Sequence, residues 1–387
     1  MAEAVAEQAR EPEEQAARAA LRRCRRVIVK IGSKSLSGDA WDRLAEEMAA
    51  LRGLRASDAG AASRRSKRAA ARSVVLVSSG AISLGMAKLG FKSRPKDMAR
   101  LQAAAAAGQS VLMQRYEDAF GKVGLVVAQV LLTHADLADR TRTNNARDAL
   151  AALLDAGAVP IINENDAVAV DEIRFGDNDQ LSAMVTPLVE ADLLILLSDV
   201  EGLLDEEGRR VPFVRSVARE ARHLAGGSTS GVGTGGMASK VEAARRATFA
   251  GAHVVIAAAR DPQVVGRVLA GDDVGTLFAA VPQRLSARKH WIAYTLRPRG
   301  ALLLDRGAAE AVTAGNRSIL AVGVLGVRGT FVPGDAISVL APEGAEIARG
   351  LARFSASDAA RIARKKKPDL EDDVVVHRDD LVLLPSE

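Results

Sequence analysis

Apolar residues gather along the chain in short continuous runs, and the segments between them repeat with the period of an amphipathic helix. Runs of this kind are typical of strands that are buried on both faces of a sheet. They predict strands at 26–31, 74–77, 124–132, 159–163, 193–197 and 253–258. The intervening segments predict helices at 41–52, 97–120, 143–156, 179–190 and 236–250. This alternation requires right-handed crossovers and predicts an α/β fold with a mostly parallel sheet covered on both faces.

The pattern changes near residues 282–299. Beyond this point short β-like runs, with Gly and Pro between them, occur at 301–304, 319–325, 336–340 and 374–376. We therefore expect two domains, an α/β domain over 25–282 and a small β-rich domain over 290–384. Residues 1–24 are rich in Ala, Glu and Arg and are expected to be a disordered N-terminal extension or a frayed helix. Residues 53–72 hold few large apolar side chains and predict a mobile basic loop without an assigned role.

The composition is that of a globular protein without a strong overall charge. Of its 387 residues, 48% are hydrophobic and 26% charged, and the formal net charge is +5. The single cysteine, Cys24, excludes an internal disulfide and suits a reducing compartment. The first residues lack the apolar core of a signal peptide, and no apolar run reaches the ~20 residues that span a bilayer. We expect a cytoplasmic protein that does not enter a membrane.

Two polar clusters lie between the strand at 159–163 and the end of the first turn of the next helix. The first is INEND at 162–166 and the second is GDND at 176–179. Ligands of open α/β sheets bind beyond the carboxyl ends of strands, so the clusters predict a binding site. Carboxylates and amides without His or Cys suit an ammonium group, a carboxyl group or a hard Mg²⁺ ion, and they argue against zinc. The alternative is a loop with Asx-turns and a helix cap.

Three further segments predict contacts with phosphate. Lys30 lies near the end of the first strand, and the turn at 32–33 offers backbone N–H groups that can approach an anion. The turn at 79–81 opens a helix after the second strand, where the helix dipole favours an anion. A glycine-rich stretch at 231–236 leads into a helix with Lys240, and it is neither a Walker A loop nor a Rossmann fingerprint. The alternatives are a surface lysine, an ordinary turn and a flexible linker.

Taken in order, these segments resemble the amino-acid kinase family, and within it the branch that phosphorylates glutamate. The matching stretches are VIVKIGS, VSSGAISLG, LLTHADLADRTRTNNARDAL, VPIINENDAVAVDEIRFGDNDQLSA, LLLSDVEGL and GVGTGGMASKVEAA. The C-terminal region resembles a PUA domain through LLLDRGAAEAV, VPGDAISV and VHRDD. The resemblance implies a three-layer αβα sandwich, the amino-acid kinase fold, followed by a small β-rich PUA domain. It also implies a kinase that uses ATP and Mg²⁺ to phosphorylate the γ-carboxylate of L-glutamate, the first step of proline biosynthesis.

The same resemblance assigns roles to individual residues. The catalytic residues it implies are Lys30, Lys240 and Asp179, with the aspartate orienting two lysines that flank the transferring phosphoryl group. The glutamate-binding residues it implies are Ser79, Gly80, Asn163, Asp166 and Asn178. The ATP-binding residues it implies are Lys30, Ser198, Asp199, Thr234, Gly235, Gly236, Met237, Ala238, Ser239 and Lys240. No residue is assigned to a metal, and on its pattern alone the turn at 198–199 also fits an ordinary capped turn.

Some features leave other interpretations open. Lys34 stands where the family usually has a small residue, and it either strengthens the phosphate site or points to solvent. A related kinase that acts on acetylglutamate, aspartate or uridylate is a second interpretation. A third is an RNA-binding protein, because PUA domains commonly bind RNA, although the C-terminal region has few aromatic residues on which bases stack. The family also implies a homo-oligomer, inhibition by L-proline and a glutamate-5-semialdehyde dehydrogenase partner, all as hypotheses.

Overall fold

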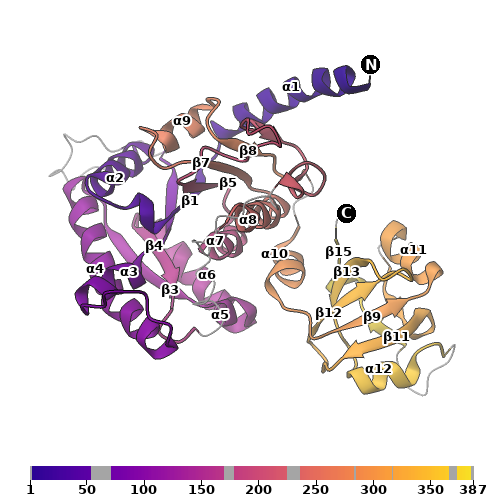
Figure 1. The fold of residues 1–387 in the computed structure, drawn as a ribbon. Helices are drawn as coiled ribbons and strands as arrows, with labels where there is room; N and C mark the ends of the chain where they lie inside the picture. Colours follow the sequence, from indigo (N-terminus) through magenta and orange to yellow (C-terminus); the bar gives the residue numbers. More distant parts are fainter. Residues whose placement is uncertain are drawn as a thin grey trace. The chain divides into compact units, whose positions relative to one another are not determined.

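The chain folds into two units in the computed structural model, residues 1–284 and 285–387 (Figure 1). The structure describes residues 2–53, 71–169, 178–224, 236–282, 285–315, 317–365 and 373–384, and it leaves out the side chains of residues 2–10 and 287. The division falls between the two ranges that the sequence pattern predicts, 25–282 and 290–384. The predicted basic loop at 53–72 lies outside the described residues except at its two ends.

Unit 1 is built around an eight-stranded sheet with the strand order β3-β4-β2-β1-β5-β7-β8-β6. Its strands are β1 Arg26–Ile31, β2 Ser73–Ser78, β3 Val127–Leu132, β4 Val159–Glu164, β5 Leu193–Ser198, β6 Phe213–Val214, β7 His253–Ala258 and β8 Thr276–Phe278. All neighbouring strands run parallel except β7 and β8, which are antiparallel. The predicted mostly parallel α/β sheet is therefore confirmed. The two short strands β6 and β8 were not predicted.

Helices cover both faces of this sheet and form a three-layer sandwich (Figure 1). They are α1 Ala2–Leu21, α2 Ala40–Leu51, α3 Ala81–Lys88, α4 Met98–Lys122, α5 His134–Ala138, α6 Arg140–Asp155, α7 Asn178–Leu188, α8 Met237–Phe249 and α9 Val264–Ala270, with short turns η1 Ser33–Ser35 and η3 Val217–Ala221. Side chains of α1, α2, α4 and α9 share one apolar core, and those of α5, α6, α7 and α8 share the other. Along β1, Val27 and Val29 belong to the first core and Ile28 to the second. The central strand is apolar at successive positions because both of its faces are covered.

Helices α3 and α4 cross at a distance that only glycine permits. A Cβ atom on Gly85 would lie 1.7 Å from the carbonyl oxygen of Ala104, and one on Gly108 would lie 1.8 Å from that of Ala81. Neither position has room for a larger residue, since a backbone oxygen cannot move aside as a flexible side chain can. The crossing fixes the start of α3, where the predicted phosphate-binding turn at 79–81 lies.

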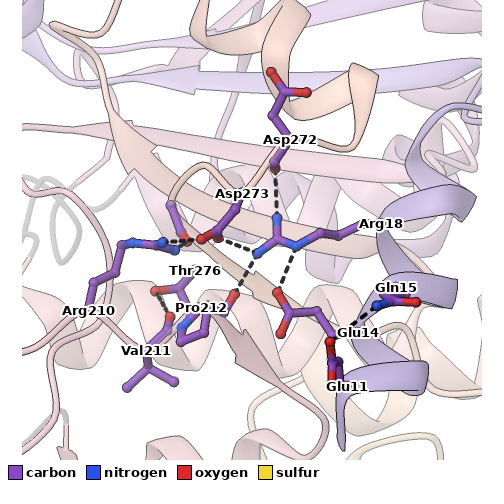
Figure 2. Close-up of polar contacts among 11 residues, drawn as sticks. Glu11, Glu14, Gln15, Arg18, Arg210, Val211, Pro212, Asp272, Asp273 and Thr276 are labelled. Atoms are coloured by element: carbon purple, nitrogen blue, oxygen red, sulfur yellow. Dashed lines mark hydrogen bonds and ion pairs between the residues drawn. The ribbon is translucent and has the colours of Figure 1, made fainter.

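The sequence pattern leaves the N-terminal extension as either disordered or a frayed helix. Its residues form α1, and Ala17 and Leu21 are buried in the core of unit 1 together with Cys24. Arg18 is also buried and is bonded to residues near β8 and β6 (Figure 2). The C-terminal part of this helix is therefore packed on unit 1, which the pattern does not predict. The composition suggested an appendage because only two or three side chains of this helix reach the core.

Unit 2 holds a five-stranded sheet with the order β11-β9-β12-β13-β15 and a two-stranded pair, β10-β14. Its strands are β9 Gly300–Leu304, β10 Ile319–Leu320, β11 Val324–Gly329, β12 Ala336–Leu340, β13 Glu346–Leu351, β14 Val374–Val376 and β15 Leu381–Leu383. Its helices and turns are α10 Ala287–His290, η5 Trp291–Thr295, α11 Arg306–Gly315, η6 Ala321–Gly323, α12 Ala356–Ile362 and η7 Arg378–Asp380. This confirms the small β-rich second domain. In the part of the chain that the structure describes, no helix is both long and apolar enough to cross a bilayer.

Candidate active site

Two lysines from distant parts of the chain meet on one carboxylate. Lys30 is the fifth residue of β1, Asp179 lies in the first turn of α7, and Lys240 lies in the first turn of α8. The Nζ atom of Lys30 is 2.5 Å from one carboxylate oxygen of Asp179, and the Nζ atom of Lys240 is 3.0 Å from the other. The side chain of Asp179 is fully buried, and those of the two lysines are 9% and 8% exposed.

This cluster has more positive than negative charge. Two ammonium groups face one carboxylate here, and the charge of Lys240 also acts on the carboxylate of Asp199. Two ammonium groups held close together favour an anion such as a phosphate group.

A network of amide groups lies beside the lysine cluster. The Nδ2 group of Asn178 donates to the carbonyl oxygen of Ser78 at 2.7 Å, to the hydroxyl of Ser79 at 2.9 Å and to the Oδ1 atom of Asn163 at 2.9 Å. The Nδ2 group of Asn163 donates in turn to the Oε1 atom of Gln109 at 2.9 Å. The network joins the ends of β2 and β4 to α4 and α7. The predicted glutamate-binding residues Ser79, Asn163 and Asn178 are therefore in contact.

Two polar atoms of this network have no hydrogen-bond partner among the described residues. They are the Nε2 group of Gln109, a donor, and the Oδ1 atom of Asn178, an acceptor, and both are buried. Buried polar groups in folded proteins are almost always paired, so an unpaired donor and acceptor in one network indicate that a ligand completes them. A carboxylate would take the donor, and an ammonium group would take the acceptor.

Gln109 was not predicted as a site residue. It lies on the buried face of α4 together with Leu101, Ala105, Leu112 and Tyr116. An amide group within an otherwise apolar helical stripe is the signal that would have identified it, because such a group requires a polar partner.

The turns that follow β1 and β2 lie against each other. Gly80 has a φ of +113°, and a Cβ atom at this position would lie 3.2 Å from the Cβ atom of Ser33. The left-handed backbone and the close approach both favour glycine. Gly80 is the N-cap of α3, so this helix starts close to Ser33, in the turn after β1. This arrangement suits an anion.

The predicted nucleotide-binding residues lie at the ends of β5 and at the start of α8. The Ser198 hydroxyl donates to the Asp199 carboxylate at 3.1 Å. This bond lowers the pKa of Asp199, and the charges of Lys34 and Lys240 lower it further. Lys34, which departs from the family pattern, lies 3.8 Å from Asp199, and both side chains are largely exposed. The extra lysine therefore lies beside Asp199, one of the predicted nucleotide-binding residues.

The rest of the predicted site is only partly described. Gly236 begins α8, and the carbonyl oxygen of Ser239 accepts a bond from Gln180 at 2.8 Å. Asp166 lies half-buried just past β4. Met237 and Ala238 occupy the first turn of α8. Thr234 and Gly235, and the segments 170–177 and 225–235, lie outside the described residues.

Comparisons with known proteins agree with this geometry. Residues 25–258 match the amino acid kinase family and residues 300–373 match the PUA domain. Glutamate 5-kinase from Trichlorobacter lovleyi is 46% identical over 389 residues, which cover 95% of this chain and 99% of that protein. Glutamate 5-kinases from Cupriavidus metallidurans and Myxococcus xanthus are 46% and 47% identical and cover 93% and 95% of this chain and 98% of their own lengths.

A solved structure shows a related fold at much lower similarity. N-acetylglutamate synthase from Neisseria gonorrhoeae, in complex with coenzyme A and N-acetyl-glutamate, superposes with a TM-score of 0.51 at 16% identity. The match covers 70% of this chain and 64% of that one, which is less than two thirds of its length. At this identity the similarity concerns the fold alone.

Proposed function

The chain belongs to the amino acid kinase family, and from this premise we propose that it phosphorylates the γ-carboxylate of L-glutamate with ATP. The product is L-glutamyl 5-phosphate, and the reaction is the first step of proline biosynthesis. The observation that carries the proposal is the buried Lys30–Asp179–Lys240 cluster, which lies beside an amide network with a free donor and a free acceptor. The first feature suits a transferring phosphoryl group and the second suits an amino acid.

The proposed reaction needs positioning and charge compensation more than proton transfer. The γ-carboxylate of glutamate has an ordinary pKa near 4.3, so it is ionised at pH 7 and needs no general base. The task that remains is to hold two anions in line and to stabilise charge on the phosphoryl oxygens. In the proposal, Lys30 and Lys240 provide that charge, and Asp179 fixes the position of both.

Recognition of glutamate is assigned to the amide network and to the INEND segment. The unpaired Nε2 group of Gln109 would bind a carboxylate of the substrate, and the unpaired Oδ1 atom of Asn178 would accept from its ammonium group. Asp166 would add a negative charge near the ammonium group. A substrate with an acylated amine loses this ammonium, which is the physical basis for preferring glutamate to acetylglutamate.

Mg²⁺ belongs to the proposal as the ion that accompanies ATP. Magnesium in kinases is bound mainly by phosphate oxygens and water, together with one or two carboxylates. Within the described residues, no group of three or more His, Cys, Asp and Glu side chains converges on one point. The lack of such a group among these residues fits an ion that arrives bound to ATP. Asp199 is a carboxylate that could face this ion. When bound, the ion would neutralise charge on the phosphate oxygens.

Hydroxylamine trapping tests the proposal directly. An acyl phosphate reacts with hydroxylamine to give a hydroxamate, which forms a coloured iron complex. The purified enzyme is incubated with ATP, Mg²⁺ and one acceptor at a time: L-glutamate, acetylglutamate, L-aspartate or uridylate. We expect a hydroxamate with L-glutamate and at most a weak signal with the other acceptors. Activity with a different acceptor but not with glutamate would favour the second interpretation, a related kinase.

A catalytic variant guards this assay against contaminating enzymes. The Lys240→Ala protein, purified in the same way, is expected to lose most of the signal, because the lysine contributes a charge to the reacting group. If the variant produced as much hydroxamate as the wild type, the activity would belong to a contaminant and the proposal would fail.

Several finer expectations belong to the same proposal. They are a homo-oligomer, inhibition by L-proline at or near the glutamate site and a glutamate-5-semialdehyde dehydrogenase partner, which would consume the unstable acyl phosphate. A cytoplasmic location follows from the use of ATP. RNA binding by unit 2 is an alternative function, and a steep dependence of RNA affinity on salt concentration would support it. L-proline at millimolar concentration is expected to raise the KM for glutamate and to leave the KM for ATP unchanged.

A further inference from the structure

The N-terminal helix α1 places a buried arginine against the edge of unit 1. Arg18 is 9% exposed. Its guanidinium donates to the carbonyl oxygen of Asp272 at 2.7 Å, to that of Pro212 at 3.2 Å and to the carboxylate of Asp273 at 2.7 Å (Figure 2). Its Nε group also donates to Glu14 of the same helix at 2.7 Å. Because a buried guanidinium is costly to desolvate, its full set of partners marks a built contact rather than a surface charge.

The carboxylate of Asp273 joins this arginine to a second one. Its other oxygen lies 2.7 Å from the Nη2 group of Arg210 (Figure 2). Arg210 also donates to the carbonyl oxygen of Gly275. The hydrogen bond from Arg210 holds the pKa of Asp273 below its ordinary range, and the charges of Arg210 and Arg18 act in the same direction. Asp273 therefore stays ionised at neutral pH and binds both guanidinium groups.

The segment held in this way supports the loop between β5 and β6. The loop leaves β5 at Ser198 and Asp199, the proposed nucleotide contacts, and returns to β6 after Val211. The hydroxyl of Thr276 accepts from the backbone N–H of Leu203 at 2.8 Å and donates to the carbonyl oxygen of Val211 at 2.7 Å. Both limbs of the loop are thus bonded to β8.

The loop passes close to β8 at Gly202. This residue has a φ of +156°, and a Cβ atom there would lie 2.5 Å from the Thr276 hydroxyl oxygen. Gly202, three residues from Asp199, therefore lies beside the residue that bonds both limbs of the loop. Arg18 is thus connected to the loop through its bond to Asp273, the short chain segment from there to Thr276, and the bonds of Thr276.

We propose that α1 acts as a brace, a structural support for the loop between β5 and β6, and that Arg18 and Asp273 are positioning residues for ATP. This inference rests on the proposed function, since it takes Ser198 and Asp199 as ATP contacts. Neither residue touches ATP, and both act by holding the segment 272–276 against the loop. The effect should appear in ATP binding and not in glutamate binding, because the glutamate residues lie on the other side of β1, at β2, β4 and α4.

Steady-state kinetics of Arg18→Ala, measured well below its melting temperature, test the inference. We expect the KM for ATP to rise roughly three- to tenfold, a range typical of residues that act on a ligand without touching it. The KM for glutamate and kcat should stay within twofold of the wild type. Asp273→Asn should act in the same direction, and the double variant should add little because the two residues form one contact. Arg18→Lys should restore ATP binding only in part, since an ammonium group cannot bond three acceptors in a fork.

Arg22→Ala is the matched control. Arg22 lies one turn further along, is exposed, and donates only to the carbonyl oxygen of Ala270 at 2.7 Å among the bonds observed, so it does not reach the loop. We expect its KM for ATP to be unchanged. An equal rise in this control would show that the whole helix stabilises unit 1 without a specific brace, and it would overturn the inference.

Two other outcomes would also overturn it. A lower melting temperature of Arg18→Ala with an unchanged KM for ATP would make α1 a stabilising element only. Equal rises in both KM values would indicate general distortion. If Arg18→Ala does not fold, the rise in melting temperature that ATP produces is compared between Asp273→Asn and the wild type, and an equal rise would count against the brace. Absence of wild-type hydroxamate activity would instead defeat the proposed function, so the two failures are separable.

Discussion

Replacement of Asp179 by Asn tests the electrostatic core of the site. Asparagine has nearly the same shape, so the fold is preserved while the carboxylate charge that both buried ammonium groups contact is removed. From the contacts of 2.5 Å and 3.0 Å to one carboxylate, those groups would stand roughly 5 Å apart. At an effective dielectric constant of about 20, two unit charges at that distance repel by about 3 kcal/mol.

The variant can relieve this repulsion if the two lysine side chains move apart. This separation weakens one of the two charges on the transferring phosphoryl group, so we expect kcat to fall by about 10²-fold, as for the loss of one charge-stabilising donor.

The assay follows ADP release by the variant and the wild type with saturating substrates at neutral pH. Ser182→Ala is the control, since the buried Ser182 hydroxyl bonds to the Asp179 carbonyl oxygen at 2.6 Å and its loss leaves all charges in place. A kcat of Asp179→Asn within threefold of the wild type would refute the reasoning.

Four further outcomes follow from the same structure. Lys240→Ala should lower kcat by ~10²–10³-fold, and initial rates within threefold of the wild type would remove the lysine from catalysis. Asp166→Ala should raise the KM for glutamate with little change in kcat, and an unchanged KM would remove it from the glutamate site. Gly85→Ala should lower the free energy of unfolding in urea by about 2 kcal/mol or more, because its Cβ would lie 1.7 Å from a backbone oxygen; an unchanged urea midpoint would show that α3 and α4 can separate. Burial alone would raise the pKa of Glu242, but hydrogen bonds from two arginines of the same helix lower it to about 2. This depressed pKa stabilises the fold above the ordinary value of 4.5 and stops doing so as pH falls towards 2. Glu242→Gln should therefore unfold at lower urea than the wild type at pH 7, with the difference shrinking below pH 4.5, and a constant difference would contradict this reading.

The strands were predictable because a strand that is buried on both faces is apolar at consecutive positions. Five of the six strands predicted from apolar runs match the observed ones to within about two residues, and the run at 124–132 starts before β3 at Val127. The polar turns and the lysines were predictable in the same local way, since the turns follow strands and the lysines lie near the end of a strand and at the start of a helix. Their meeting point was not given by the local pattern. Lys30, Asp179 and Lys240 come from β1, α7 and α8, and only the parallel order of the sheet brings those elements together.

Other features were out of reach for a physical reason. Strands β6 and β8 contain two and three residues, which is too short for a periodic signal. Apart from Glu14, the partners of Arg18 lie 194 to 255 residues away along the chain, so nothing near it in sequence distinguishes it from a solvated charge. Gln109 is intermediate between these cases, because its place in an apolar helical stripe is visible but its partner, Asn163, is not. Sequence patterns show which side chains are buried, but they do not show which residues those side chains contact.

The position of β1 explains why one site can hold both substrates. The chain builds the sheet outwards from this strand, first to β2, β3 and β4 on one side and then to β5, β7 and β8 on the other. Ligands of open α/β sheets bind where the direction of building reverses, because the two following segments separate there and leave a crevice. Lys30 lies at the carboxyl end of β1, at this point of reversal. The amide network belongs to the strands on one side and the Ser198–Asp199 turn to those on the other, so under the proposed assignment of these residues a group transferred between the two ligands would pass Lys30.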